Sequence, residues 1–257
     1  MDMHHHQAVA SNGWQLAPEI LLPIILLAYL YLRFSNSTLG QKVYFFTGIA
    51  SILAVVLTPI GVRAMDYFTL HMIQHITLMM ISGPLLVLGT GLTFHPKNFL
   101  FQTFTHPVIS WVAYAALMVG VHLPAPHNFI MNNPWAHTYI EVPLYIVIPY
   151  FFYFNLLDRN LTNRRVTSAM SVISLFLMMA PETLTGFFIY VSRVSLYEDM
   201  YSLDDQRRGG SFMWSGAMII DAIWMSFAVY HWIKSEERKS IQISAEIENE
   251  KVVQNEP

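Results

Sequence analysis

The sequence contains no cysteine, few charged residues and no long basic run, and each absence excludes a class of protein or site. Without cysteine the chain can form neither a disulfide framework nor a thiolate metal site, so soft-metal ligands must come from its 15 Met and 11 His. Charged residues make up only 12% of the 257 residues, and the formal net charge is −3. This charge balance provides no basic surface for nucleic acid, which is therefore excluded as a partner.

Hydrophobic residues make up 54% of the chain and are gathered in successive apolar runs. Each run spans roughly 17 to 25 residues, which is the length needed to cross the hydrocarbon core of a bilayer. The segment before the first run lacks the basic stretch of a cleaved signal peptide, so this run is expected to stay in the protein. We expect about seven spans, at roughly residues 18–34, 42–60, 66–90, 107–123, 136–157, 166–190 and 210–233.

The sequence therefore predicts an all-α integral membrane protein that is a bundle of about seven transmembrane helices. Residues 1–17 form an outer amino-terminal segment, residues 18–233 form the membrane domain, and residues 234–257 form a cytoplasmic polar tail. The tail mixes Glu, Lys, Ser and Asn without an apolar face long enough to bury. We expect it to be solvated and mobile.

The lysines and arginines predict the orientation, because basic residues of short loops are retained in the cytoplasm. Ten of them fall on one side of the alternating spans and four on the other. The larger group is Arg33, Lys42, Lys97, Arg159, Arg164, Arg165, Lys234, Arg238, Lys239 and Lys251, and the smaller group is Arg63, Arg193, Arg207 and Arg208. The amino terminus is therefore expected outside and the carboxyl terminus inside.

The third span carries the clearest candidate site. His71 and His75 are one helical turn apart, so both imidazoles lie on one face, and Met72 and Met79 lie near the same stripe. Imidazole and thioether ligands without cysteine suit copper best, because Met binds cuprous copper well and zinc poorly. The same pattern is typical of histidines that form hydrogen bonds between helices and of methionines that only pack. Spacing alone leaves both interpretations open.

Other spans place polar groups on the same outer side of the bundle. The fourth span ends at His122, the fifth begins with His137 and Glu141, and the sixth carries Glu182 in its outer half. Ionisable groups inside a membrane are costly and tend to mark functional sites, so this gathering predicts a shared, outward-facing site. His127 lies in a proline-rich outer loop and is expected to be solvated.

Three blocks of the sequence resemble the signatures of a known family. They are Phe68 through His75 and on to Gly89; His122-Leu123-Pro124 with Asn133-Pro134-Trp135-Ala136-His137; and Asp204-Asp205-Gln206 with Gly209-Gly210 and Met213. In this order, over roughly residues 68 to 214, they resemble the CtaG-type cytochrome c oxidase assembly factors. The same short name also covers an unrelated one-span copper chaperone with essential cysteines, which the absence of cysteine excludes.

The resemblance implies a seven-span factor in the plasma membrane of a prokaryote that is needed to make an active haem-copper oxidase. It implies copper as the metal, oxidase subunits as partners beside the lipid bilayer, and no enzymatic activity. The residues that match the family's blocks by position are His71, His75, His122, His137, Asp205 and Gln206. The family often has a further histidine near Glu141, where this chain has none, which gives Glu141 or a methionine more weight as a ligand.

Two other functions stay open at this stage. A haem-binding or structural accessory subunit of a respiratory complex would use His71 with His122 or His137 as axial ligands. A membrane-embedded zinc hydrolase would combine the histidines of the third span with a carboxylate, but the chain lacks the Glu beside the first His that a metalloprotease helix shows. The histidines at residues 4–6 are either a further place of copper capture or a flexible polar terminus.

Overall fold

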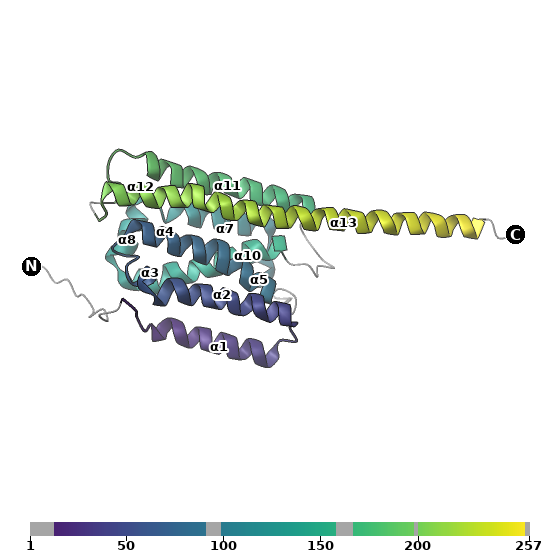
Figure 1. Cartoon of the computed structure of the whole chain (residues 1–257), viewed down its shortest axis with the longest axis horizontal. Helices are drawn as coiled ribbons and strands as arrows, with labels where there is room; N and C mark the ends of the chain where they lie inside the picture. Colours follow the sequence, from purple (N-terminus) through teal and green to yellow (C-terminus); the bar gives the residue numbers. More distant parts are fainter. Residues whose placement is uncertain (1–12, 91–98, 158–166, 198–199, 255–257) are drawn as a thin grey trace, which may run out of the picture.

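The computed structural model describes residues 13–90, 99–157, 167–197 and 200–254, with side chains to residue 248. Within these ranges every regular element is helical, which confirms the all-α prediction (Figure 1). The α-helices are α1 (Pro18–Phe34), α2 (Leu39–Leu57), α3 (Pro59–Val62), α4 (Phe68–Ile76), α5 (Gly83–Thr90), α6 (Phe99–Phe104), α7 (Pro107–Gly120), α8 (Pro124–Asn132), α9 (Pro134–Ala136), α10 (Val142–Leu157), α11 (Ser168–Val191), α12 (Leu203–Ser211) and α13 (Ala217–Gln254). Three π-helical segments join some of them: η1 (Thr77–Ser82), η2 (His137–Glu141) and η3 (Phe212–Gly216). The histidines at residues 4–6 lie outside the described residues.

Five helical stretches are long and apolar enough to cross a membrane: α2, Phe68–Thr90, Pro134–Leu157, α11 and Leu203–Glu248. The bent pair of α7 and α8 would make a sixth, and α1, with 17 residues, is shorter than the five. By length and composition the chain is a multi-pass membrane protein. The count of seven spans and the orientation stay predictions.

The outside of the bundle is apolar, as expected of helices that face lipid. Leu22 and Phe34 of α1 and Phe176 and Phe188 of α11 are between 64% and 73% exposed. Soluble proteins rarely expose large contiguous apolar patches of this kind. α1 begins at the end of the bundle where α8 and α12 lie, and α13 leaves at the opposite end (Figure 1).

The stretch Phe68–Thr90 is the centre of the bundle, with 72% of its apolar window buried. At Gly89 an added Cβ would lie 2.7 Å from the Cα of Phe45, so α5 approaches α2 at this distance only with glycine. Phe45 stacks on Tyr31 with 3.8 Å between ring centroids, and the Tyr31 hydroxyl donates to the Gly89 carbonyl at 3.1 Å. These contacts hold α1 on the bundle.

Two segments differ from the sequence predictions. The fourth span does not run straight to His122, because α7 ends at Gly120 and α8 leaves it at an angle of 75°. Pro124 begins α8, and a residue before proline avoids helical geometry. The tail from residue 234, for which the sequence predicted no regular element, is helical, because α13 continues through Gln254, and its described side chains from residue 236 are exposed. Its residues favour a helix, and exposed pairs such as Lys234 with Glu237 support it.

Candidate metal centre

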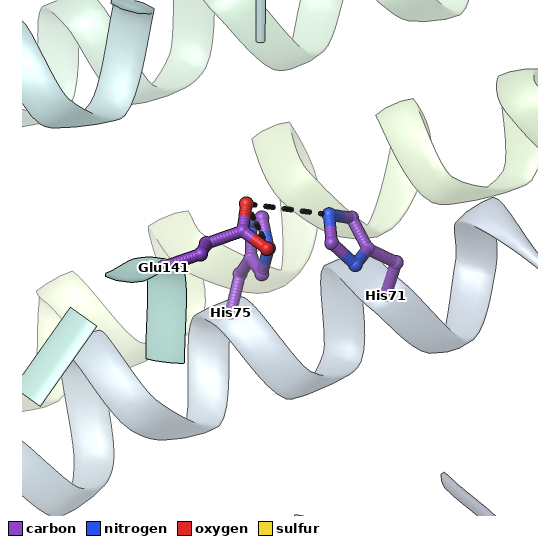
Figure 2. Close-up of side chains that lie close together, drawn as sticks. All are labelled: His71, His75 and Glu141. Carbon is purple, nitrogen blue, oxygen red and sulfur yellow. Dashed lines mark ion pairs between the residues drawn. The ribbon is translucent and has the colours of Figure 1, made fainter. Parts of the chain in front are cut away.

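His71, His75 and Glu141 form the centre of the site. Figure 2 shows both imidazole rings on one side of α4, close to the carboxylate that η2 supplies. Glu141 Oε1 lies 3.7 Å from His71 Nε2 and 3.5 Å from His75 Nε2, and the three ligand atoms all lie within 4.8 Å of one another. Nitrogen and oxygen ligands at about 2.0–2.1 Å from a tetrahedral ion lie about 3.4 Å apart. The three atoms are therefore spaced much as ligands of one metal ion.

Two residues of the same helical stretch orient the Glu141 carboxylate. The Tyr145 hydroxyl donates to Oε1 at 3.0 Å, and His137 Nδ1 donates to Oε2 at 2.6 Å. His137 and Glu141 both belong to η2, while η1 begins two residues after His75. π-helical turns are frequent at functional sites. Because Nδ1 of His137 is engaged, only its Nε2 could reach a metal.

Further histidines surround this centre. The ring of His122 lies 5.4 Å from that of His75, and the rings of His127 and His137 lie 5.3 and 5.7 Å from that of His71. The four histidines selected from the sequence thus come together. The prediction that His127 is solvated is wrong, because this residue lies in α8 with its ring packed against those of Phe68, His71 and Tyr197 and is only 1% exposed.

Many ring nitrogens of the cluster have no hydrogen-bond partner. This holds for Nδ1 of His71, Nδ1 of His75 and Nε2 of His122, while Nε2 of His71 and of His75 have only the contacts of 3.7 and 3.5 Å with Glu141 Oε1. His122 Nδ1 donates to the Met118 carbonyl at 2.5 Å, which leaves Nε2 with a free lone pair in the neutral ring. Buried polar atoms without a partner are uncommon and costly. Ligation of a metal ion would satisfy them, so the residues present fit a metal.

Two tyrosines of the segment between α11 and α12 cover the histidines. The Tyr197 hydroxyl donates to the His122 carbonyl at 3.2 Å, and its ring lies 4.1 Å from the His127 ring. The Tyr201 hydroxyl lies 3.4 Å from His127 Nε2. Burial raises the pKa of both tyrosine hydroxyls above the usual range, so both stay protonated and can donate. They shield the histidines from solvent.

The two methionines selected from the sequence are fully buried in the core. Met72 faces α12, because an added Cβ at Gly209 would lie 3.2 Å from its Cγ. Met79 belongs to η1, one helical turn beyond His75. Both remain predicted ligands.

Asp205 of α12 positions the helix that carries His71 and His75. Its carboxylate accepts the backbone N–H of Phe68 at 2.6 Å and of Thr69 at 3.3 Å, and the Thr69 hydroxyl at 2.6 Å. The first N–H groups of a helix have no partner within it and favour a negative charge. Asp205 is thus a cap for α4 that is supplied from a distant part of the chain.

Gln206 and two glycines hold α12 in place. The Gln206 side chain accepts the N–H of Leu196 at 2.8 Å and so fixes the loop after α11. An added Cβ would lie 2.3 Å from the Phe68 ring at Gly209 and 2.7 Å from the backbone of α11 at Gly210. The structure therefore gives the predicted supporting pair, Asp205 and Gln206, a positioning role.

Glu182, the other predicted supporting residue, lies in a different group. Its buried carboxyl interacts with Asp221 of α13 and Tyr114 of α7, and within the described residues it makes no ion pair with a histidine. Asp221 is not among the site residues predicted from the sequence. An acidic residue in the middle of an apolar run was the signal that could have found it.

Comparison with protein families gives one match over most of the chain. A family model described as cytochrome c oxidase caa3 assembly factor (Caa3_CtaG) matches residues 26–235, which include the whole metal centre. No solved structure matches the chain.

Curated relatives are mycobacterial and distant. An uncharacterized protein of Mycobacterium leprae is 20% identical over 235 residues, which cover 79% of this chain and 36% of the relative. Uncharacterized proteins of Mycobacterium bovis and Mycobacterium tuberculosis are each 22% identical over 240 residues, which cover 80% of this chain and 36% of the relative. The chain thus spans only 36% of the length of these relatives.

Proposed function

The chain belongs to the family of cytochrome c oxidase caa3 assembly factors, and we propose that it serves the assembly of a haem-copper oxidase. In this proposal it binds copper at His71, His75 and Glu141 and delivers the copper to oxidase subunits. In this role the protein is not an enzyme, because it holds and releases a metal without converting a substrate. The single observation that carries the proposal is the convergence of two imidazoles and a carboxylate, with free ring nitrogens, on one buried point.

The ligand types support copper. Imidazole nitrogen suits copper and zinc alike, whereas the thioethers predicted to complete the set favour cuprous copper. Charge points the same way, because two neutral imidazoles, one carboxylate and Cu⁺ form a group with no net charge. A neutral group is the least costly to bury between membrane helices.

The surroundings of the site support delivery rather than storage. No cysteine is available, so the ion would be held by nitrogen, oxygen and thioether, which bind Cu⁺ less tightly than thiolates do. α4 begins at the end of the bundle where α8 and α12 lie (Figure 1). Tyr197 and Tyr201 contact His122 and His127 at this site. An oxidase subunit that displaces these two tyrosines would reach the histidines.

Copper content of the purified protein tests the proposal. Wild type, the double variant His71→Ala/His75→Ala and the control His106→Ala are loaded with Cu⁺ under reducing conditions, and copper per folded protein is measured after excess copper is removed. His106 is an exposed histidine at the start of α7, so its loss controls for nonspecific imidazole binding. We expect wild type and control to retain copper and the double variant to lose it.

Cells give a second measurement. The double variant is expected to lose oxidase activity, and added copper is expected to restore part of it if delivery is the role. Equal copper content in wild type and double variant contradicts the proposal. An absorption spectrum with a haem band would instead favour the haem-binding accessory subunit.

A further inference from the structure

His127 of α8 is a buried histidine that the three proposed copper ligands leave unused. Its ring lies 5.3 Å from the ring of His71, at an interplanar angle of 82°. Two imidazoles that bind one ion through nitrogens at about 2.0–2.1 Å have ring centres about 5–6 Å apart. His127 is therefore as far from His71 as a second imidazole ligand of the same ion would be.

One nitrogen of the His127 ring has a lone pair that only a weak contact occupies. The Val121 carbonyl accepts a hydrogen bond from this ring, and Nε2 faces the Tyr201 hydroxyl at 3.4 Å. The proton therefore lies on Nδ1, and Nε2 accepts from Tyr201 over a long and hence weak hydrogen bond. Metal-binding histidines commonly donate their second ring nitrogen to a carbonyl in this way.

His127 lies between the metal centre and an exposed turn. The four residues before it, at positions 123–126, are exposed, whereas His127 itself is 1% exposed. His122, by contrast, adjoins His75, which lies one helical turn farther from the start of α4 than His71 does. His127 thus connects His71 to the end of the bundle where α8 and α12 lie (Figure 1).

We propose that His127 is the exit ligand of the copper site, to which the ion passes before it leaves the protein. This inference rests on the proposed function, because it concerns the route of the same copper ion. In the step, Cu⁺ keeps its bond to His71, the bond to His75 breaks, and a bond to Nε2 of His127 forms. The copper stays cuprous, and the displaced Tyr201 hydroxyl keeps its proton, so no electron or proton is transferred.

Tyr201 is the latch of this route. While its hydroxyl donates to Nε2 of His127, the lone pair that would receive copper is occupied. Tyr197 covers the same site, but its hydroxyl donates to the backbone carbonyl of His122, so its loss frees no ring nitrogen. Tyr197→Phe is therefore the matched control for Tyr201→Phe.

Extraction of copper by a water-soluble cuprous chelator tests the proposal. The purified full-length protein is loaded with Cu⁺ in detergent, excess copper is removed, and the absorbance of the chelator complex is followed in time. His127→Phe keeps an aromatic ring but has no lone pair, so we expect it to retain copper and to release it about tenfold more slowly than wild type. Tyr201→Phe should release copper about threefold faster, because it lacks the weak hydrogen bond, and Tyr197→Phe should release it at the wild-type rate.

The double variant His127→Phe/Tyr201→Phe separates a latch from a simple cover. If Tyr201 acts through His127, its replacement has no effect on the release rate once His127 is gone. Equal acceleration by Tyr201→Phe with and without His127 would overturn the proposal.

Two further results would also overturn it. One is release from His127→Phe at the wild-type rate or faster, and the other is loss of copper from folded His127→Phe at equilibrium, which would make His127 a resting ligand. His127→Leu serves for the same comparison if His127→Phe does not fold. Wild type that retains no copper would refute the proposed function together with the exit route. Wild type that retains copper but releases it as His127→Phe does refutes the exit route alone.

Discussion

Replacing Asp205 separates a positioning residue from a metal ligand. Asp205→Ala removes the acceptor of two backbone N–H groups and of the Thr69 hydroxyl at the start of α4. Loss of a helix cap costs about 0.5–2 kcal/mol, and a further hydrogen bond to a charged group contributes about 1.5–3 kcal/mol. We therefore expect a loss of about 2–5 kcal/mol, and about half of that for Asp205→Asn, which keeps one acceptor oxygen.

Thermal unfolding in one detergent measures this loss, and Asp204→Ala is the control because it removes the same charge from the same turn. At about 2–4 °C per kcal/mol for a chain of this size, Asp205→Ala should melt several degrees below the control. Copper binding should weaken in Asp205→Ala, since His71 follows the capped turn, and should survive in Asp205→Asn. Equal melting of Asp205→Ala and Asp204→Ala would refute the capping role. Complete loss of copper in Asp205→Asn would make Asp205 a ligand.

The remaining predictions concern packing, metal preference and orientation. Gly89→Ala should destabilise the protein by about 1–3 kcal/mol, because the added Cβ meets the backbone of Phe45 at 2.7 Å. The control Gly120→Ala, whose added Cβ has nothing within 4 Å, should not lower the melting temperature. Equal melting temperatures of the two variants would show that α2 and α5 can separate freely. Met79→Leu should weaken the binding of cuprous copper more than that of zinc, measured by competition with a chromogenic chelator, and an equal effect on both ions would remove Met79 from the ligand set. A reporter fused after Lys251 should be active only in the cytoplasm, and activity outside would reverse the predicted orientation.

Much of the fold could be predicted because length and hydropathy decide which segments cross a membrane. The helices formed where the apolar runs lie, and His71 and His75 share a face because of their four-residue spacing. Pro124 marks the end of the fourth span in the sequence, but the residues after it are predicted to form a loop, whereas the structure has them in α8. A proline can begin a helix as readily as it ends one, so its effect on His127 depended on where α8 packs.

The contacts between distant residues could not be predicted from local pattern. The cap of α4 joins Thr69 to Asp205, which is 136 positions away, and the carboxyls of Glu182 and Asp221 meet across two helices. Periodicity shows which face of a helix is apolar and does not show which helix will cover that face. The π-helical turn that carries His137 and Glu141 likewise has no simple sequence signal.

X-ray absorption spectroscopy of the copper-loaded protein tests the central claim most directly, because it reports the atoms bound to copper. The account predicts a copper ion bound mainly by nitrogen and oxygen at about 2 Å, with the outer-shell scattering of at least two imidazoles. This imidazole scattering should be absent from the His71→Ala/His75→Ala protein and unchanged in the His106→Ala protein. A spectrum without imidazole scattering in wild type, or one that the double substitution leaves unchanged, would contradict the assignment of copper to His71, His75 and Glu141.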